Sequence, residues 1–478
     1  MEITSFHFLI FVVIVLGVYH ALPRRGQNLW LLIASYAFYV FWSWQFAILL
    51  LVATLFHFEL AKHLRKDGQG RVALLWLGIG ADLVLFMVFK ASSFYLYRLA
   101  TLLEQSGVQS GLGALQIVIP LGMSYYILQN ISYLIDVFRG QIQPSTNRVD
   151  FALYLAYFPK MVAGPIERAR TFLPILAKPR QVDNQVLARA LVLILIGLTR
   201  KLLIANLLFA HLPWDDFIGN SSIFSRFELF GWLVVYAFGL YNDFAGYTNI
   251  VRGVSLLFGI ELSANFNAPY FSRSITEFWN RWHITLSQWL RDYIFFPVNR
   301  ALAKRFGSGN MLTMVIPPML TMLVSGFWHG PNWQMLVWGG LHGTYLVGER
   351  LLTARRSPSG GVQNRVWAGQ ATQLFTFLLV AFAWVPFAMR MPFAIDFWQQ
   401  LLVGNNVFGL INYRLLFSLI FLIPSIWLDT VQSRESDETA FFLHQTQTAQ
   451  AALLATVIVL LLVVTSSGAG QPFIYQGF

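Results

Sequence analysis

His329 is the residue of this 478-residue chain whose surroundings point most directly to chemistry. It stands in the segment Ser325-Gly-Phe-Trp-His-Gly-Pro-Asn-Trp333, which joins two apolar runs with almost no loop. An ionisable side chain in such a place is costly unless it has a function or a partner. A desolvated imidazole stays neutral and can accept a proton from a hydroxyl group, as a general base must. We therefore predict that His329 is a general base; the alternative is a turn residue at the membrane interface.

A second histidine, His283, stands in a polar, tryptophan-rich segment that covers residues 277–292. The spacing predicts one helix over this segment, in which Glu277 and Arg281 are four residues apart and can pair. His283 would share a face of that helix with Ser287. A helix of this kind lies at the membrane interface or plugs a tunnel, and we favour a functional role for His283. The alternative is an amphipathic surface helix, in which Arg281 has a structural role.

A third feature is the segment Tyr157-Phe-Pro-Lys-Met-Val-Ala-Gly-Pro-Ile-Glu-Arg168. Its prolines prevent a continuous helix, and Gly164 permits a sharp bend. Irregular backbone among membrane helices must be buried in protein or line a wet cavity, so this pattern predicts a re-entrant segment. The charged side chains could meet the phosphates of a nucleotide-bearing donor, or they could anchor the segment at the cytoplasmic surface. These side chains are Lys160, Glu167 and Arg168.

Two further positions carry polar groups among apolar residues. His342 follows His329 along the next apolar run and could line the same cavity. Asn242 and Asp243 stand at the end of another apolar run. Asp243 could orient a histidine or pair with Arg252, and the sequence leaves both possibilities open.

Several familiar kinds of active site are excluded or disfavoured. The chain has no cysteine, which excludes disulfides, thiolate metal sites and a cysteine nucleophile. It also has no phosphate-binding G-x-x-x-x-G-K loop, no G-x-S-x-G elbow and no H-E-x-x-H zinc motif. ATP-driven transport, serine hydrolysis by that elbow and zinc proteolysis therefore lose support, and we expect no metal.

The composition indicates what must position these residues. Hydrophobic residues make up 56% of the chain and charged residues 12%, far from the usual composition of a soluble protein. Because a helical span needs about 20 apolar residues, the chain predicts roughly ten to twelve spans. We predict an all-α polytopic integral membrane protein with one domain over residues 1–478.

The predicted spans are separated by short polar connections. Spans are expected at residues 6–22, 29–40, 45–60, 72–90, 115–137, 190–210, 228–250, 311–327, 333–349, 369–388, 408–428 and 450–465. The net charge of +11 comes from Lys and Arg clustered between these runs. Such clusters indicate cytoplasmic loops beside anionic membrane lipid rather than nucleic-acid binding. They include Arg24, Arg25, Lys62, Arg65, Lys66, Arg71, Arg300, Lys304, Arg305, Arg350, Arg355, Arg356 and Arg365.

Three ordered blocks resemble the membrane-bound O-acyltransferase family. The first is the segment that ends at Arg168, and the last is Gly326-Phe-Trp-His-Gly330. Between them stands Asn265-Phe-Asn-Ala-Pro-Tyr-Phe-Ser-Arg-Ser-Ile-Thr-Glu-Phe-Trp-Asn-Arg-Trp-His-Ile-Thr-Leu-Ser-Gln-Trp-Leu-Arg-Asp-Tyr293. The sequences of these blocks are similar to those of the bacterial branch of alginate O-acetyltransferases and the related D-alanine transferases of teichoic acids. The resemblance covers a motif-bearing core of about residues 150–345.

The resemblance implies a ring of helices with re-entrant segments around a central tunnel, in a bacterial cytoplasmic (inner) membrane. It places the catalytic histidine at His329 and a second motif histidine at His283. It implies a thioester donor, acetyl-CoA, arriving from the cytoplasm, and an extracytoplasmic polysaccharide as acceptor. The acyl group could pass directly or through a partner protein similar to SGNH-hydrolase acetyltransferases. The expected donor contacts are Lys160, Arg168, Arg281, Trp282, Trp328 and Asn332, of which Trp328 and Asn332 could also stabilise an oxyanion.

Other functions remain compatible with the sequence. The acceptor of the same chemistry could be a lipid or a lipidated protein. A polytopic, tryptophan-rich tunnel also suits a polysaccharide or lipid-linked sugar transporter, although we find no internal repeat of the kind common in transporters. A non-enzymatic scaffold for a polymer-secretion complex is a further alternative.

Overall fold

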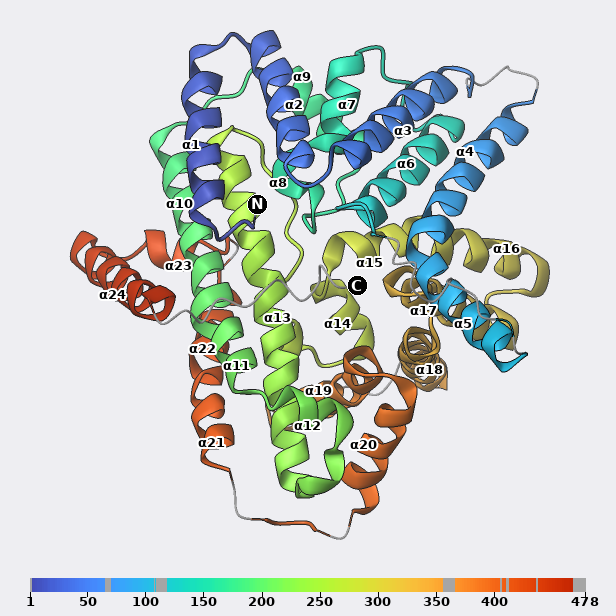
Figure 1. The fold of residues 1–478 in the computed structure, drawn as a ribbon, viewed down its shortest axis with the longest axis vertical. Helices are drawn as coiled ribbons and strands as arrows, with labels where there is room; N and C mark the ends of the chain where they lie inside the picture. Colours follow the sequence, from blue (N-terminus) through green and yellow to red (C-terminus); the bar gives the residue numbers. More distant parts are fainter. Residues whose placement is uncertain are drawn as a thin grey trace. The chain divides into compact units, whose positions relative to one another are not determined.

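The computed structural model describes residues 2–64, 70–106, 108, 118–355, 366–404, 406–409, 412–435 and 437–466. All regular secondary structure within these ranges is helical (Figure 1). This confirms the predicted all-α class. Arg65, Lys66, Arg356 and Arg365 of the predicted basic loops lie outside the described residues.

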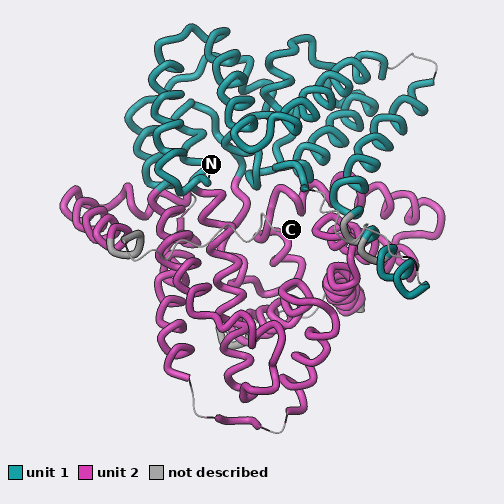
Figure 2. Tube along the Cα trace, viewed as in Figure 1, with its two compact units in different colours: residues 1–194, 250–263 teal, residues 195–249, 264–478 magenta. Residues whose placement is uncertain are grey.

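The helices form two compact units (Figure 2). Unit 1 comprises residues 1–194 and 250–263, and unit 2 comprises residues 195–249 and 264–478. Two helices contribute residues to both units, namely α10 (Asn184–Leu198) and α13 (Arg226–Leu257). One domain over residues 1–478 stays a prediction.

Unit 1 is built around α2, which packs against α1, α3 and α7, while α4 packs against α6. Apolar composition explains the helices, and their ends follow local signals: Ser5, Ser43 and Asn147 cap the first turns of α1, α3 and α7 with their side-chain oxygens. The segment of residues 157–168 is buried, and the short α8 is its only helix before α9 begins. The bounds are α1 (Phe6–Ala21), α2 (Arg24–Val40), α3 (Trp44–Lys62), α4 (Arg71–Phe86), a π-helix (Met87–Ala91), α5 (Ser92–Gln105), α6 (Met123–Phe138), α7 (Arg148–Ala156), α8 (Phe158–Met161) and α9 (Ala169–Ala177).

Unit 2 contains the helices that carry the histidines. Its most extensive helix pair is α17 with α18, and glycines allow their backbones to come close. A Cβ atom at Gly326 would lie 2.2 Å from the carbonyl oxygen of Met335, and one at Gly339 would lie 2.3 Å from that of Met322. The bounds are a π-helix (Thr199–Ala205), α11 (Asn206–His211), α12 (Trp214–Gly219), α14 (Ile275–Arg281), α15 (Ile284–Leu290), a second π-helix (Arg291–Phe295), α16 (Phe296–Phe306), α17 (Met311–His329), α18 (Trp333–Arg355), α19 (Val366–Ala388), α20 (Met391–Val403), α21 (Tyr413–Ile420), α22 (Leu422–Gln432), α23 (Ala440–Leu443) and α24 (Gln447–Ser466).

Six helical stretches in the described part of the chain are long and apolar enough to cross a membrane. They are residues Trp44–Lys62, Arg71–Ala91, Asn184–His211, Met311–His329, Gly369–Ala388 and Tyr413–Gln432. The number is below the predicted ten to twelve because α1, α2 and α6 have 16, 17 and 16 residues, fewer than the roughly 20 of a typical span. Polar residues also interrupt the apolar character of α13 and α18.

The prediction of one helix over residues 277–292 is wrong. The segment divides into α14 and α15, and His283 between them has φ 40°, in the left-handed region. Residues 265–267 form hydrogen bonds with the backbone at this break, in place of the hydrogen bonds of a continuous helix. The amide of Asn267 donates to the carbonyl of Arg281 (3.0 Å), and the amide of Ile284 donates to that of Asn265 (2.9 Å). A long-range pairing therefore outweighs the local helical pattern.

Candidate active site

Three imidazole rings and two indole rings alternate in a buried row within unit 2. The row runs His283, Trp328, His329, Trp338, His342, and neighbouring ring centroids are 6.2, 4.8, 5.1 and 5.1 Å apart. No side chain of the row is more than 7% exposed. We call these five residues the histidine row. The two histidines predicted to be functional thus share one indole neighbour.

His329 is the last residue of α17, directly before the short turn to α18. Its side chain is only 4% exposed, and its ring also contacts Phe387 of α19 at 5.3 Å. The close packing of Gly326 against α18 fixes the last turn of α17 and hence the direction of His329. His329 therefore combines the predicted turn position with the burial that a neutral imidazole base requires.

His283 is completely buried at the break between α14 and α15. Its ring meets the edge of Phe244 at 4.9 Å, in addition to Trp328. Burial lowers the pKa of His283 well below its ordinary value, which keeps the ring neutral near physiological pH. A left-handed backbone is unusual for a residue other than glycine and is often found at functional positions.

His342 lies on α18 and is fully buried by aromatic rings. It stacks on Phe278 at 6.1 Å with an angle of 8° between the rings, and it meets Trp279 at 5.0 Å. His342 and His329 both contact Trp338. That they line one cavity stays a prediction.

A cavity of about 560 Å³ lies beside the row, between the helices from α14 to α18. Its wall is mostly apolar and includes Arg291 and Arg350. Trp279 is part of this wall and also contacts Trp338, at 5.8 Å. The sequence analysis did not predict the cavity, because its lining comes from six separate helical segments.

Three of the predicted donor residues of unit 2 also have structural contacts. Arg281 pairs with Glu277 at 2.7 Å, which confirms that predicted pair. Trp282 is buried against Trp384, with ring centroids 5.0 Å apart. Asn332 caps α18 by accepting the amide proton of Met335 at 3.0 Å.

Comparison with known proteins shows the family to which the chain belongs. The sequence profile of MBOAT, the membrane-bound O-acyltransferase family, matches residues 143–387. The chain belongs to the membrane-bound O-acyltransferase family. It is therefore an O-acyltransferase and a multi-pass membrane protein.

The names of individual relatives of this acyltransferase refer to alginate, peptidoglycan and teichoic acid. The chain is 35% identical to the probable alginate O-acetylase AlgI of Azotobacter vinelandii over 381 residues, 79% of this chain and 73% of the relative. It is 31% identical to the peptidoglycan O-acetyltransferase of Helicobacter pylori over 76% of this chain and 71% of the relative. It is 32% identical to the teichoic acid D-alanyltransferase of Streptococcus thermophilus over 48% of this chain and 56% of the relative.

The predicted donor residues Lys160 and Arg168 belong to unit 1 of the acyltransferase. Lys160 is fully buried and donates to the side-chain oxygen of Gln129 at 2.5 Å. Burial lowers the pKa of its ammonium group and raises the pKa of Glu167. Glu167 accepts the amide proton of Ser263 at 2.7 Å, and Arg168 is 7% exposed. These side chains therefore sit within the unit rather than at its surface.

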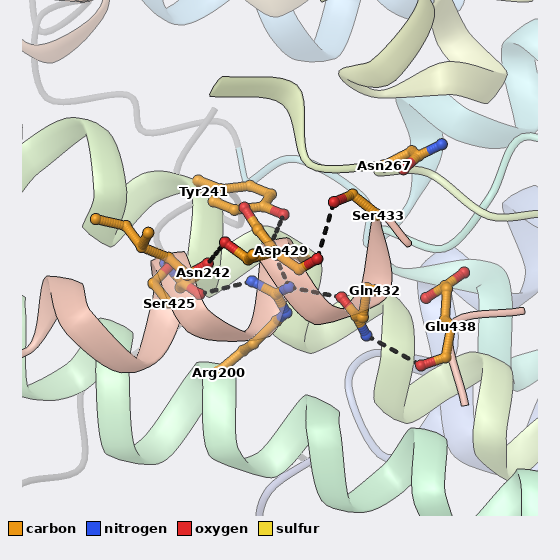
Figure 3. Close-up of polar contacts among 12 residues, drawn as sticks. Arg200, Tyr241, Asn242, Asn267, Ser425, Asp429, Gln432, Ser433 and Glu438 are labelled. Carbon is orange, nitrogen blue, oxygen red and sulfur yellow. Dashed lines mark hydrogen bonds and ion pairs between the residues drawn. The ribbon is translucent and has the colours of Figure 1, made fainter. Parts of the chain in front are cut away.

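Unit 2 of the acyltransferase also contains a buried polar cluster that sequence analysis missed (Figure 3). Arg200 pairs with Asp429 at 2.5 Å and donates to Asn242 and Gln432, each at 2.9 Å. Tyr241 donates its hydroxyl proton to Asp429 at 2.8 Å. We call these five residues the Arg200 cluster. The signal in the sequence was the pair Arg200-Lys201 in one apolar run and Asp429 in another.

Asp243, next to this cluster, pairs with Lys201 at 2.5 Å. The sequence analysis considered a histidine or Arg252 as the partner of Asp243, and it did not consider Lys201. Lys201 directly follows Arg200, so one π-helix supplies both of these positively charged side chains. Within the described residues, no group of three His, Asp or Glu side chains could hold a metal ion.

Proposed function

We propose that this acyltransferase moves an acetyl group from acetyl-CoA on the cytoplasmic side to a hydroxyl of an extracytoplasmic polysaccharide. The observation that carries the proposal is the buried position of His329 within the histidine row. The names of the relatives, which include O-acetylases of alginate and peptidoglycan, support the acetyl group and the polymeric acceptor. The enzyme would lie in the cytoplasmic (inner) membrane of a bacterium.

In the proposed reaction, the acceptor oxygen attacks the thioester carbonyl carbon while His329 takes the hydroxyl proton. A carbon–oxygen bond forms, the carbon–sulfur bond breaks, and the proton passes from His329 to the departing thiolate to give coenzyme A. General base catalysis of this kind contributes about 10² to 10⁴ in rate. His283 assists His329 through Trp328, whose ring contacts both imidazoles. Trp328 and Asn332 are candidates for stabilising the oxyanion.

The cavity beside the row is a suitable place for the donor. Its apolar wall fits the uncharged arm of coenzyme A, and Arg291 and Arg350 offer two guanidinium groups for its phosphates. Arg281 and Trp282 lie on or next to α14, which contributes to the cavity wall. We keep Lys160 and Arg168 as proposed donor contacts on the ground of the family motif that contains them.

The acceptor could receive the acetyl group directly or from a partner that relays it. A secreted acetyltransferase similar to SGNH hydrolases would supply a hydroxyl nucleophile for such a relay. If the acceptor is a lipid or a lipidated protein, the chemistry is the same, and only the product that carries the label differs.

The test is transfer of radiolabelled acetyl from acetyl-CoA by membranes that contain the wild type or His329→Ala. We expect the variant to lose at least about a hundredfold in rate while its size-exclusion profile stays that of the wild type. Undiminished labelling of polymer by the variant would overturn the role of His329. Label in lipid or lipoprotein, with none in polysaccharide, would overturn the proposed acceptor.

A further inference from the structure

Polar atoms without protein partners gather at one end of the histidine row. Both ring nitrogens of His342 and the indole nitrogens of Trp279 and Trp338 are buried, and none of them has a hydrogen-bond partner among the described residues. The exposed fractions of these three side chains are 0, 8 and 1%. A buried polar group without a partner destabilises the folded protein, because it has lost its hydration and gained no hydrogen bond. One such group is common, but a cluster of them is unusual in a native protein.

The ring contacts of His342 are with aromatic side chains. It lies against the rings of Phe278, Trp279, Trp338, Tyr345 and Trp384. Among these, only the tyrosine hydroxyl can accept a proton well. The stacking on Phe278 also holds the imidazole plane in one orientation. The cluster is therefore suited to a polar group that a ligand provides.

The cluster adjoins both the cavity and the proposed base. Trp279 forms part of the cavity wall and contacts His342, while Trp338 contacts both His342 and His329. The polar cluster therefore links the cavity wall to the proposed base.

We infer that His342, with the indole groups of Trp279 and Trp338, binds the amide and thioester groups of the donor arm and positions the thioester at His329. This inference rests on the proposed function, since it takes acetyl-CoA as the donor. A neutral imidazole offers one donor and one acceptor, and each indole offers one donor. The pantetheine arm with its thioester presents three carbonyl acceptors and two amide protons, which complements this set. His342 is a donor-binding residue and takes no proton in the reaction.

The decisive variants are His342→Phe and His342→Gln, with His57→Phe as a matched control. His57 is also a buried histidine, 2% exposed, but its ring nitrogens are bonded to Asp82 at 3.0 Å and to the carbonyl of Ala53 at 2.8 Å. Replacing an unsatisfied polar group by an apolar ring of similar shape is nearly neutral or stabilising. Removing a satisfied one leaves Asp82 without its histidine partner.

We expect His342→Phe to keep or raise the thermal-unfolding midpoint of the purified protein and to raise the KM for acetyl-CoA about tenfold, the effect of losing one or two hydrogen bonds. Its kcat should stay within about threefold, and the stabilisation of the protein by added coenzyme A should shrink. His342→Gln, which keeps a donor and an acceptor, should recover part of the KM. His57→Phe should lower the midpoint and leave the KM unchanged.

Wild-type KM in both His342 variants would overturn the inference. So would a fall in kcat at unchanged KM, because that would place His342 in the chemical step. If His342→Phe does not fold, the KM of His342→Gln decides by the same criterion. These outcomes are distinct from failure of the proposed function, in which the wild type does not use acetyl-CoA or His329→Ala remains fully active.

Discussion

The Arg200 cluster and the histidine row are both polar and both buried in unit 2, but the protein satisfies them differently. In the Arg200 cluster, the guanidinium group has a carboxylate and two side-chain amide oxygens as partners, and the carboxylate also accepts from Tyr241 (Figure 3). At the end of the histidine row, the nitrogens of Trp338 and His342 have no partner within the described chain. The first arrangement is complete without a ligand, whereas the second is complete only with one.

The comparison separates two reasons for burying a polar group in a membrane protein. A closed network offsets the loss of hydration within the fold and joins helices that are distant in sequence, here by 229 residues between Arg200 and Asp429. An open set of groups is kept ready for a substrate at some expense in stability. Substitutions in the two regions should therefore affect different measurements.

Asp429→Ala should have the largest effect on stability. It leaves Arg200 buried without its carboxylate, and breaking a buried ion pair from one side costs about 3–5 kcal/mol. The thermal-unfolding midpoint in detergent and the yield of folded protein should both fall. The double variant Arg200→Met with Asp429→Leu should recover much of the loss, because no unpaired charge remains. A wild-type midpoint for Asp429→Ala would remove the basis of the comparison.

His283→Gln should act on turnover instead. A displaced catalytic geometry can cost up to about a hundredfold in rate, and we expect a loss between about tenfold and that value. The thermal midpoint should change little. Initial rates with acetyl-CoA, measured beside the midpoint, check this. Near-normal turnover would mean that His283 has only a structural role and that the functional part of the histidine row begins after it.

Tyr241→Phe sharpens the contrast by removing a single bond from the closed network. The hydroxyl donates to a carboxylate, and such bonds contribute about 1.5–3 kcal/mol. We expect a lower midpoint with an unchanged KM for acetyl-CoA. Tyr270→Phe is the control, because its hydroxyl donates to the neutral carbonyl of Ala237 at 2.8 Å and should cost only about 1 kcal/mol. Equal effects of the two variants would argue against a special role of the Asp429 charge.

Glu277→Gln should have the smallest effect. The Glu277–Arg281 pair is partly exposed, at 33% and 28%, and i,i+4 pairs of this kind contribute about 0.2–0.5 kcal/mol. The midpoint should hardly move. If Arg281 contacts the donor, Arg281→Ala raises the KM for acetyl-CoA while Glu277→Gln leaves it within about twofold. Equal KM values for both variants would limit Arg281 to its pairing with Glu277.

The sequence by itself determined the helical class, the membrane setting and the family, and it led to the prediction that His329 is the base. These follow from local information: apolar composition fixes which segments enter lipid, and prolines at 159 and 165 prevent a continuous helix between α7 and α9 wherever the rest of the chain lies. The turn position of His329 was likewise readable from the two runs that flank it.

The tertiary structure alone decided the backbone at His283, the partner of Arg200 and the set of groups around His342. The local pattern predicted one helix through His283, and only the hydrogen bonds from residues 265–267 ended it. Hydropathy marks a buried arginine as costly but does not say which carboxylate will meet it. A hydrogen bond depends on positions in space, so whether a buried polar group is paired or left for a substrate appears only when distant helices are packed together.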